Sequence, residues 1–263
     1  MSSGNYVIWV AVMILLSGGA YSFGSIHHVA TTTTTTTMVS TGIVVPLYTY
    51  PTDSSWSTLI SIKQSYPTVP IIAIINPSSG VGGSQDPNFV TGIEQLQAAG
   101  ITVLGYVYTS YAGRDLQSIE TEMSEYQSWY GVNGIFFDEM SGAADTQSYY
   151  STLANYSESL GLTMTMGNPG AGVSTNLVGV FTNLCIYENA GLPSLSQLSA
   201  YPSYGKQYFS FIAYGVEGFP GQSTVLSTAT YVSYLYISDL GGGNPYNGLP
   251  SYLTSEVAAL AAA

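Results

Sequence analysis

Charge is scarce in this sequence, and positive charge is scarcest. Only 7% of the 263 residues are charged, and 3 Lys and Arg stand against 15 Asp and Glu, which gives a formal net charge of -12 at pH 7. A surface with so few cations cannot neutralise a phosphate backbone, so nucleic acids are excluded as partners. Anionic lipid headgroups are excluded by the same argument.

Cysteine and metal-binding patterns are scarce as well. Cys185 is the only cysteine, so no intrachain disulfide can form, and its apolar context NLCIYE predicts a small buried side chain. The adjacent His27 and His28 precede a threonine tract and are interpreted as linker residues. Because no His/Cys cluster has metal-ligand spacing, we expect neither a metal nor another cofactor.

Apolar and aromatic residues are plentiful. The hydrophobic fraction of 46% suffices for the core of one large domain, and α/β barrels commonly have this length. The 23 tyrosines can pack, hydrogen-bond and stack against sugar rings. The alternative interpretation is that tyrosine only serves as an uncharged surface residue.

The first 41 residues differ from the rest. Residues 1–24 contain an apolar stretch followed by small residues, as in a secretory signal peptide cleaved near Ala20. No Lys or Arg precedes this stretch, so an uncleaved membrane anchor is the alternative, although the stretch is short for a span. Residues 25–41, with seven consecutive threonines, predict a linker. The signal peptide and the uncleaved anchor both predict a secreted or cell-surface protein. Any contact with a membrane would be made only through residues 1–24.

Apolar runs alternate with amphipathic segments from Gly42 onward. Their near-continuous hydrophobicity is typical of parallel strands that are buried on both faces. Three amphipathic segments, 88–100, 115–131 and 146–161, end in Gly as helices do. The eight predicted strands are 42–50, 70–77, 102–109, 134–140, 163–168, 184–189, 208–215 and 231–238.

Eight strands, each followed by a helix or a long crossover, predict a single (β/α)8 barrel over residues 42–263. A doubly wound open sheet uses similar elements, but no Gly-rich phosphate loop follows the first strand. Barrel active sites lie at the C-terminal ends of the strands, so the polar residues there are candidates. The predicted catalytic residues are Asp138, Glu139 and Glu188, and the predicted substrate-binding residues are Tyr48, Asn76, Tyr106, Arg114, Asn168, Tyr214 and Asp239.

Carboxylates with tyrosines and amides at one rim suit hydrolysis of a glycosidic bond, in which one carboxyl protonates the leaving oxygen and another attacks or activates water. Asp138 and Glu139 point to opposite faces of a regular strand, so we expect one to face the barrel opening and the other to turn with the loop. Glu188 would reach across to complete a pair. We expect one carboxyl of the adjacent pair to stay protonated as general acid, because neighbouring carboxylates repel.

Structural roles are the alternatives for these residues. One carboxylate of the adjacent pair could instead cap a helix or pair with Arg114, and Arg114 could simply begin an acidic helix. Asn76 and Asn168 each precede Pro in a turn, which explains the Pro and the nearby Gly but does not require Asn.

Seven stretches carry a family resemblance: VPLYTYP, IINPSSGVGG, GYVYTSYAGRD, GIFFDE, NPG, YEN and LYISDLGGGNPYNGLPSY. In this order, from about Gly42 to Tyr252, they resemble the spherulin-4-like (spherulation-specific) family. The resemblance implies a (β/α)8 barrel and kinship with secreted fungal glycoside hydrolases that cut galactosamine-containing polysaccharide. It also implies that the functional acids are Asp138, Glu139 and Glu188.

Two classes of function remain open. The first is a secreted or surface-tethered glycosidase whose partner is a carbohydrate polymer. The second is a non-catalytic surface protein that binds carbohydrate or forms part of an extracellular assembly. The three acids favour the enzyme, whereas an uncleaved anchor and a Tyr-rich exterior favour the assembly. The sequence does not predict an oligomeric state.

Overall fold

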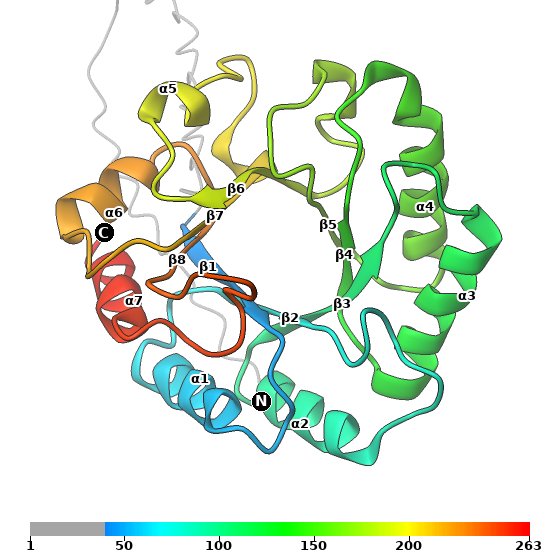
Figure 1. Cartoon of the computed structure of the whole chain (residues 1–263), viewed down its shortest axis with the longest axis horizontal. Coiled ribbons are helices and arrows are strands. Elements are labelled where there is room, and N and C mark those ends of the chain that lie inside the picture. Colours follow the sequence, from blue (N-terminus) through cyan, green and yellow to red (C-terminus); the bar gives the residue numbers. More distant parts are fainter. Residues whose placement is uncertain (1–39) are drawn as a thin grey trace, which may run out of the picture. The chain divides into compact units, whose positions relative to one another are not determined.

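Eight parallel strands close into a barrel in the computed structural model, which describes residues 40–263 (Figure 1). Each strand pairs with the next along the chain, and β8 pairs with β1 through Gly42 and Tyr234. The (β/α)8 barrel is confirmed, and the open sheet is excluded. The strands are β1 Gly42–Leu47, β2 Ile71–Ile75, β3 Thr102–Tyr108, β4 Gly134–Asp138, β5 Met164–Gly167, β6 Asn183–Ala190, β7 Phe209–Tyr214 and β8 Tyr234–Ile237.

Two predicted segments fall at the N-terminus of the chain. The signal peptide or anchor (1–24) and all but the last two residues of the linker (25–41) lie outside the described residues. Within residues 40–263, no helix has the length and apolarity needed to cross a membrane.

The strands are buried along almost their whole length. Every residue of β1 (GIVVPL) and of β2 (IIAII) is buried, because one face of each strand lines the barrel interior and the other lies under helices. This double burial explains why the apolar runs in the sequence are continuous rather than alternating.

Helices cover most of the barrel's outer surface. The N-terminal helices begin at aspartates whose side chains accept a backbone N–H, as Asp53, Asp86 and Asp115 do for α1, α2 and α3. The helices are α1 Ser54–Ser65, α2 Pro87–Ala98, α3 Leu116–Glu125 with a wider turn Tyr126–Tyr130, α4 Gln147–Ser159, α5 Leu195–Leu198, α6 Gln222–Thr228 and α7 Leu253–Ala261, with short turns Ala144–Thr146, Thr175–Leu177 and Lys206–Tyr208.

The helical layer is thin outside β5 and β6, where Figure 1 shows loops and the four-residue α5. The connection from β5 to β6 contains only the turn Thr175–Leu177. The sequence predicted either a helix or a long crossover after each strand, and this connection is a long crossover.

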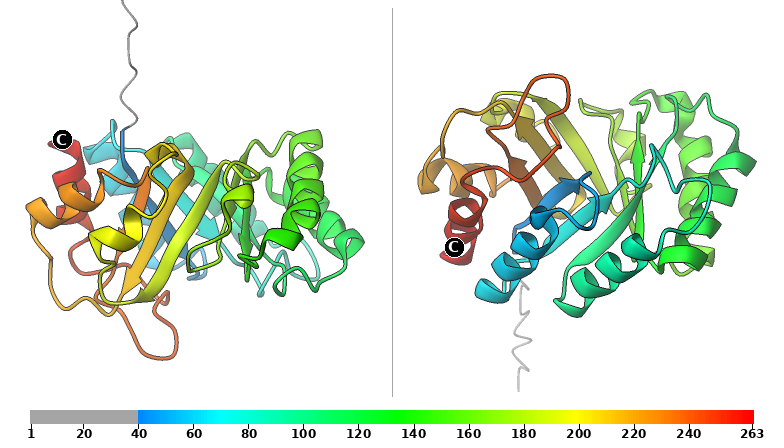
Figure 2. Two further views of the ribbon diagram at one scale, coloured as in Figure 1. Left: turned by 90° about the horizontal axis from the view of Figure 1, so that it is seen from above. Right: turned by 60° about the horizontal axis from the view of Figure 1, so that its bottom comes forward.

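The loop between β8 and α7 projects beyond one end of the barrel (Figure 2). Asp239 anchors this loop, because its carboxylate accepts hydrogen bonds from the backbone N–H (3.1 Å) and the hydroxyl of Ser251. The loop therefore lies at the C-terminal end of the strands, where barrel active sites form.

Candidate active site

A single amide joins two carboxylates at the C-terminal end of the barrel. Asp138 ends β4, Asn168 directly follows β5, and Glu188 lies in β6. Asn168 Nδ2 donates to Asp138 Oδ1 (2.7 Å) and to Glu188 Oε2, while Asn168 Oδ1 accepts from the backbone N–H of Gly170 (3.0 Å). The Gly170 contact fixes which end of the amide faces the acids.

Two tyrosines complete this cluster. The Tyr106 hydroxyl donates to Asp138 Oδ2 (2.8 Å), and the Tyr246 hydroxyl donates to Glu188 Oε1. The Tyr48 ring packs edge-on against both tyrosine rings, with centroid distances of 5.8 Å to Tyr106 and 5.4 Å to Tyr246. Every oxygen of the two carboxylates therefore accepts a hydrogen bond, and three tyrosines pack around the two acids.

The electrostatics of the two acids follow from this arrangement. Burial raises the pKa of Glu188; the hydrogen bonds from Tyr246 and Asn168 lower it, and the charge of Asp138 raises it further. The net direction is upward, so Glu188 holds its proton to a higher pH than an ordinary glutamate. Burial and the nearby carboxylates also raise the pKa of the Tyr106 and Tyr246 hydroxyls, which therefore remain donors.

A β-bulge directs Glu188 toward the cluster. Cys185 pairs with Ser210 of β7, whereas Glu188 pairs with Ile212, so β6 contains one more residue than β7 between these pairs. An unbroken register would place Glu188 opposite Ala213, and a shift of one residue turns a side chain to the other face of the sheet. The bulge thus decides on which side of the barrel wall the Glu188 carboxylate lies.

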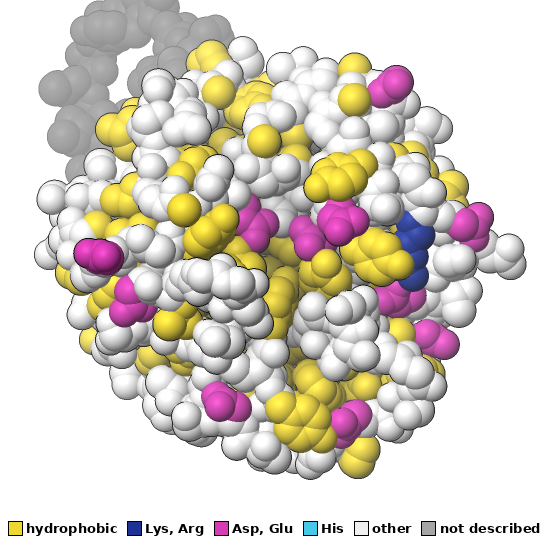
Figure 3. Space-filling model, viewed as in Figure 1, with side chains coloured by type: hydrophobic (Ala, Val, Ile, Leu, Met, Phe, Trp, Pro, Cys, Tyr) yellow, Lys and Arg dark blue, Asp and Glu magenta, His cyan; other side chains and the backbone are white. Residues whose placement is uncertain are grey.

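Acidic side chains line one edge of a hollow near the middle of this end of the barrel (Figure 3). Among residues 40–263 no group of three or more His, Cys, Asp or Glu is arranged to hold a metal ion. The arrangement supplies two hydrogen-bonded carboxylates and aromatic walls, which are the components of acid–base chemistry on a sugar.

Comparison with known proteins places this chain in a family. The model of spherulation-specific family 4 matches residues 42–260. The chain belongs to this family. Spherulin-4 from Physarum polycephalum is 34% identical over 238 residues, which cover 83% of this chain and 69% of that protein. The resemblance noted in the sequence is confirmed.

Solved structures share the fold of this spherulation-specific protein. Sph3 from Aspergillus clavatus, solved in complex with GalNAc, has a TM-score of 0.77 at 24% identity and covers 85% of this chain and 98% of its own. The spore cortex-lytic enzyme SleL from Bacillus cereus has a TM-score of 0.51 at 10% identity over 84% of this chain and 74% of its own. At these identities the likeness establishes the barrel fold alone.

Glu139 takes a different path from its neighbour. Its backbone is left-handed, with φ of 49°, and its carbonyl accepts from the Tyr111 N–H (2.7 Å) and the Thr109 hydroxyl (2.8 Å). The chain therefore turns at the Asp138–Glu139 pair. Within the described part of the chain the Glu139 carboxylate makes no hydrogen bond. Burial and Asp138 are the larger causes of the raised pKa of Tyr106, and the charge of Glu139 raises it further. The Glu139 carboxylate therefore lies beside the cluster.

The other predicted substrate-binding residues divide into two groups. Tyr214 lies near the cluster, since its ring packs edge-on against Tyr246 at 6.4 Å. Asn76, Arg114 and Asp239 have other partners: Asn76 Oδ1 accepts the N–H of Gly80 (2.8 Å), Arg114 pairs with Glu122 (2.6 Å), and Asp239 holds Ser251. A polar residue at a strand end can either contact a substrate or stabilise the loop that follows. Its position at the strand end does not distinguish these two roles.

Tyr246 is the member of the cluster that the sequence analysis missed. It lies in GGGNPYNG, eight residues beyond the last residue of the eighth predicted strand, so its position in the sequence is not that of a strand end. The signal available was a single aromatic residue among Gly, Asn and Pro in a loop, the kind of segment that often carries functional residues.

Proposed function

We propose that this protein is a glycoside hydrolase that acts outside the cell on a galactosamine-containing polysaccharide. The observation that carries the proposal is the shared Asn168 amide, which holds Asp138 and Glu188 together at the barrel opening. Membership of spherulation-specific family 4 and the GalNAc bound to the related Sph3 barrel support the choice of an amino sugar.

The separation of the two acids favours a retaining mechanism. The two N–H bonds of one amide nitrogen diverge by about 120°, so oxygens about 2.8 Å from that nitrogen lie about 5 Å apart. Carboxyl groups about 5–5.5 Å apart are typical of retaining glycosidases, whereas about 6.5–9.5 Å leaves room for the water of an inverting one.

The roles follow from the surroundings of each acid. Glu188, whose pKa is raised by burial, protonates the glycosidic oxygen as the bond to the anomeric carbon breaks. Asp138, held by Tyr106 and Asn168, attacks that carbon and forms a covalent ester. Glu188 then removes a proton from water, and the resulting hydroxide displaces Asp138 from the sugar. In this proposal Glu188 is the general acid, and Glu139 offers the substrate a further hydrogen-bond acceptor.

The test compares Asp138→Asn, Glu139→Gln and Glu188→Gln on purified galactosamine-containing polysaccharide. Loss of Asp138 or Glu188 should lower kcat by at least ~10²-fold, because general acid and nucleophile each contribute that much. Glu139→Gln should act mainly on KM. The control is Glu217→Gln, an exposed carboxylate in the loop after β7 at the same end of the barrel. NMR of the first product should show the anomeric configuration of the substrate.

Two results would contradict the proposal in different ways. Near-full activity of Asp138→Asn and Glu188→Gln would place the chemistry elsewhere. A wild-type chain that binds such polymers but cleaves none of a broad panel would establish the second candidate, a non-catalytic carbohydrate-binding protein, whose binding site the same acids and tyrosines would form.

A further inference from the structure

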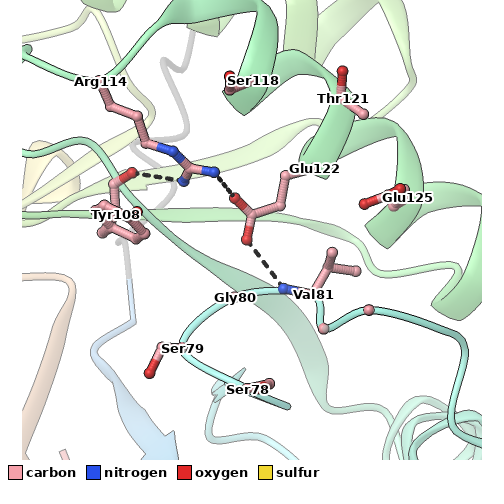
Figure 4. A pocket seen from close by; sticks show the side chains of 12 residues that line it. Ser78, Ser79, Gly80, Val81, Tyr108, Arg114, Ser118, Thr121, Glu122 and Glu125 are labelled. Carbon is pink, nitrogen blue, oxygen red and sulfur yellow. Dashed lines mark hydrogen bonds and ion pairs between the residues drawn. The ribbon is translucent and has the colours of Figure 1, made fainter.

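A separate pocket lies at the same end of the barrel, between the loop after β2 and helix α3 (Figure 4). Its volume is about 400 Å³, within the range of small-ligand sites. None of its lining residues belongs to the Asp138–Asn168–Glu188 cluster. They are the loop residues 78–83, together with Tyr108, Arg114, Ser118, Thr121, Glu122 and Glu125.

A locked ion pair forms one wall of this pocket. Arg114 Nη2 lies 2.6 Å from Glu122 Oε2, and Glu122 Oε1 accepts the backbone N–H of Val81 (3.0 Å). Arg114 Nη1 donates to the Tyr108 carbonyl (3.1 Å), and the guanidinium lies 4.3 Å from the centroid of the Tyr108 ring. These contacts use two of the five guanidinium N–H groups and fix its plane, so the group is preorganised as a donor.

The loop opposite the ion pair has a strained backbone. Ser79 has φ of 52°, which is uncommon for a residue other than glycine. A Cβ at residue 80 would lie 2.1 Å from Glu122 Oε1, so a side chain there would displace that carboxylate. Strain of this kind persists only where the surroundings enforce it, and it concentrates at ligand-binding sites.

The chemistry of the pocket suits an uncharged ligand with several hydroxyl groups. Arg114 is neutralised by Glu122, and the Glu125 carboxylate leaves the pocket net negative, which disfavours phosphates and other anions. Four hydroxyl-bearing residues, Ser78, Ser79, Ser118 and Thr121, line it. The Tyr108 ring, 36% exposed, offers a stacking surface of the kind that sugars use.

The pocket adjoins the candidate active site. Tyr108 is the register partner of Asp138 in the β3–β4 pair, and it also lines the pocket. The neighbouring Tyr111 is 67% exposed, lies in a left-handed stretch from Ser110 to Ala112, and donates its N–H to the Glu139 carbonyl. In Figure 3, hydrophobic side chains separate the central acids from the dark-blue side chain at the edge of this face.

We infer that this pocket is a second sugar-binding subsite, which holds a unit of the polysaccharide a short distance along the chain from the bond cut at Asp138. The inference rests on the proposed function and deepens it: the substrate is a polymer long enough to reach both places. Tyr108 and Tyr111 provide the aromatic surface between them.

The experiment fills the pocket without disturbing the ion pair. Thr121 is exposed on α3, and its hydroxyl bonds only to the carbonyl one turn earlier (2.8 Å), so Thr121→Trp should fold normally and block the pocket. Thr152→Trp is the matched control: Thr152 is exposed on α4, makes the same bond to its own preceding turn (3.0 Å) and does not line the pocket. Thermal unfolding of each variant checks the fold.

We expect KM of the wild-type chain to fall as galactosamine oligosaccharides are lengthened, until both subsites are filled. Thr121→Trp should raise KM on the long oligosaccharides about tenfold, the scale of one modest contact, and leave kcat and the shortest cleaved oligosaccharide unchanged. Thr152→Trp should match the wild type. Arg114→Lys, which keeps the charge but loses the planar donor, should raise KM on the long substrates only.

The outcomes separate the two proposals. If Thr121→Trp matches the wild type at every length, the subsite is refuted while the glycosidase stands. If the wild type cleaves none of the oligosaccharides, the glycosidase is refuted, and equilibrium binding of the longest oligosaccharide then decides the subsite. If the wild type binds this oligosaccharide more tightly than Thr121→Trp does, the subsite is supported. If the two bind it equally, or neither binds it, the subsite is refuted.

Discussion

Asp138 and Glu188 carry the same functional group in different surroundings. Asp138 is half-buried and is bonded by Tyr106 and Asn168, whereas burial dominates the environment of Glu188 and raises its pKa. A glutamate whose pKa is raised by burial can keep its proton and act as general acid. At this scale the decisive contact for Glu188 is the Tyr246 hydroxyl.

Tyr246→Phe tests that contact. The hydroxyl stabilises the ionised form of Glu188, so its loss should raise the pKa of Glu188 further. Glu188 must be protonated to act as general acid, so the alkaline limb of the pH–activity profile should move to higher pH. A hydrogen bond to a charged group is worth about 1.5–3 kcal/mol, so kcat/KM at neutral pH should change by about tenfold or more. Tyr214→Phe, which alters a ring packed on Tyr246, is the control. An unmoved alkaline limb in Tyr246→Phe would refute the role of the hydroxyl.

The elements around the site depend on close approaches between strands and helices. Gly105 of β3 faces Tyr126, in the wide turn that continues α3, and a Cβ on residue 105 would lie 2.5 Å from the Tyr126 ring. Tyr126 is fully buried, so a movement of its ring would disturb the surrounding core. The small residue in β3 therefore sets how closely α3, with Arg114 just before it and Glu122 within it, approaches the barrel.

Gly105→Ala should lower the free energy of unfolding by about 1–3 kcal/mol, the usual cost of overpacking a dense core. Urea denaturation measures this change. Gly83→Ala is the matched control, since a Cβ at residue 83 has no neighbour within 4 Å and the backbone there is not left-handed, so its stability should stay within about 0.5 kcal/mol of the wild type. Equal stability of the two variants would show that the Tyr126 ring can shift.

The whole molecule carries little charge, and most of its cations are committed to neutral partners. Lys63 Nζ donates to the carbonyls of Pro67 and Val69, and Lys206 Nζ donates to Thr41 Oγ1 and the Ala229 carbonyl. Arg114–Glu122 is the one Lys- or Arg-based ion pair in the described part of the chain. The pH dependence of stability must therefore come chiefly from individual buried acids and from the net charge of -12.

Glu256 of α7 is the most deeply buried of these acids. It is fully buried, its Oε1 accepts the Ile237 N–H (3.1 Å), and burial raises its pKa well above the ordinary 4.5. A raised folded-state pKa contributes stability that is complete below the unfolded value and lost as the pH rises through the folded value. Glu188 acts in the same direction. The lowered pKa of Asp53 acts oppositely, but its stabilisation is lost only as the pH falls below about 3.8.

The melting temperature should therefore rise as the pH falls from about 8 to about 4.5. Glu256→Gln keeps the acceptor oxygen and removes the titrating group. It should therefore raise the melting temperature at pH 8, by about 2–4 °C for each kcal/mol gained in the free energy of unfolding, and make the melting temperature depend less on pH. The exposed Glu94→Gln on α2 is the control and should leave the slope unchanged. A Glu256→Gln profile as steep as that of the wild type would rule out Glu256 as the source.

Local features of the sequence were enough to predict the barrel. Eight continuous apolar runs form β1 to β8, because each strand needs the same double burial wherever it lies, and the structure begins each within three residues of its predicted start. The position of Asp138 at the end of β4 follows from the run GIFFD that precedes it. The helices 88–100, 115–131 and 146–161 correspond to α2, α3 with its wide turn, and α4.

Tertiary structure alone decided how the polar residues are paired. Asn168 joins Asp138 and Glu188 across 30 and 20 residues of sequence, and Tyr246 reaches Glu188 across 58. Arg114 joins Glu122 rather than the adjacent acids, and the bulge in β6 turns Glu188 toward the cluster. Hydrophobic periodicity records which residues are buried, because burial depends on the strand itself. A hydrogen bond between distant segments depends on the strand register and on the path of the loops that bring the two segments together. The local sequence of either segment determines neither the register nor the loop path.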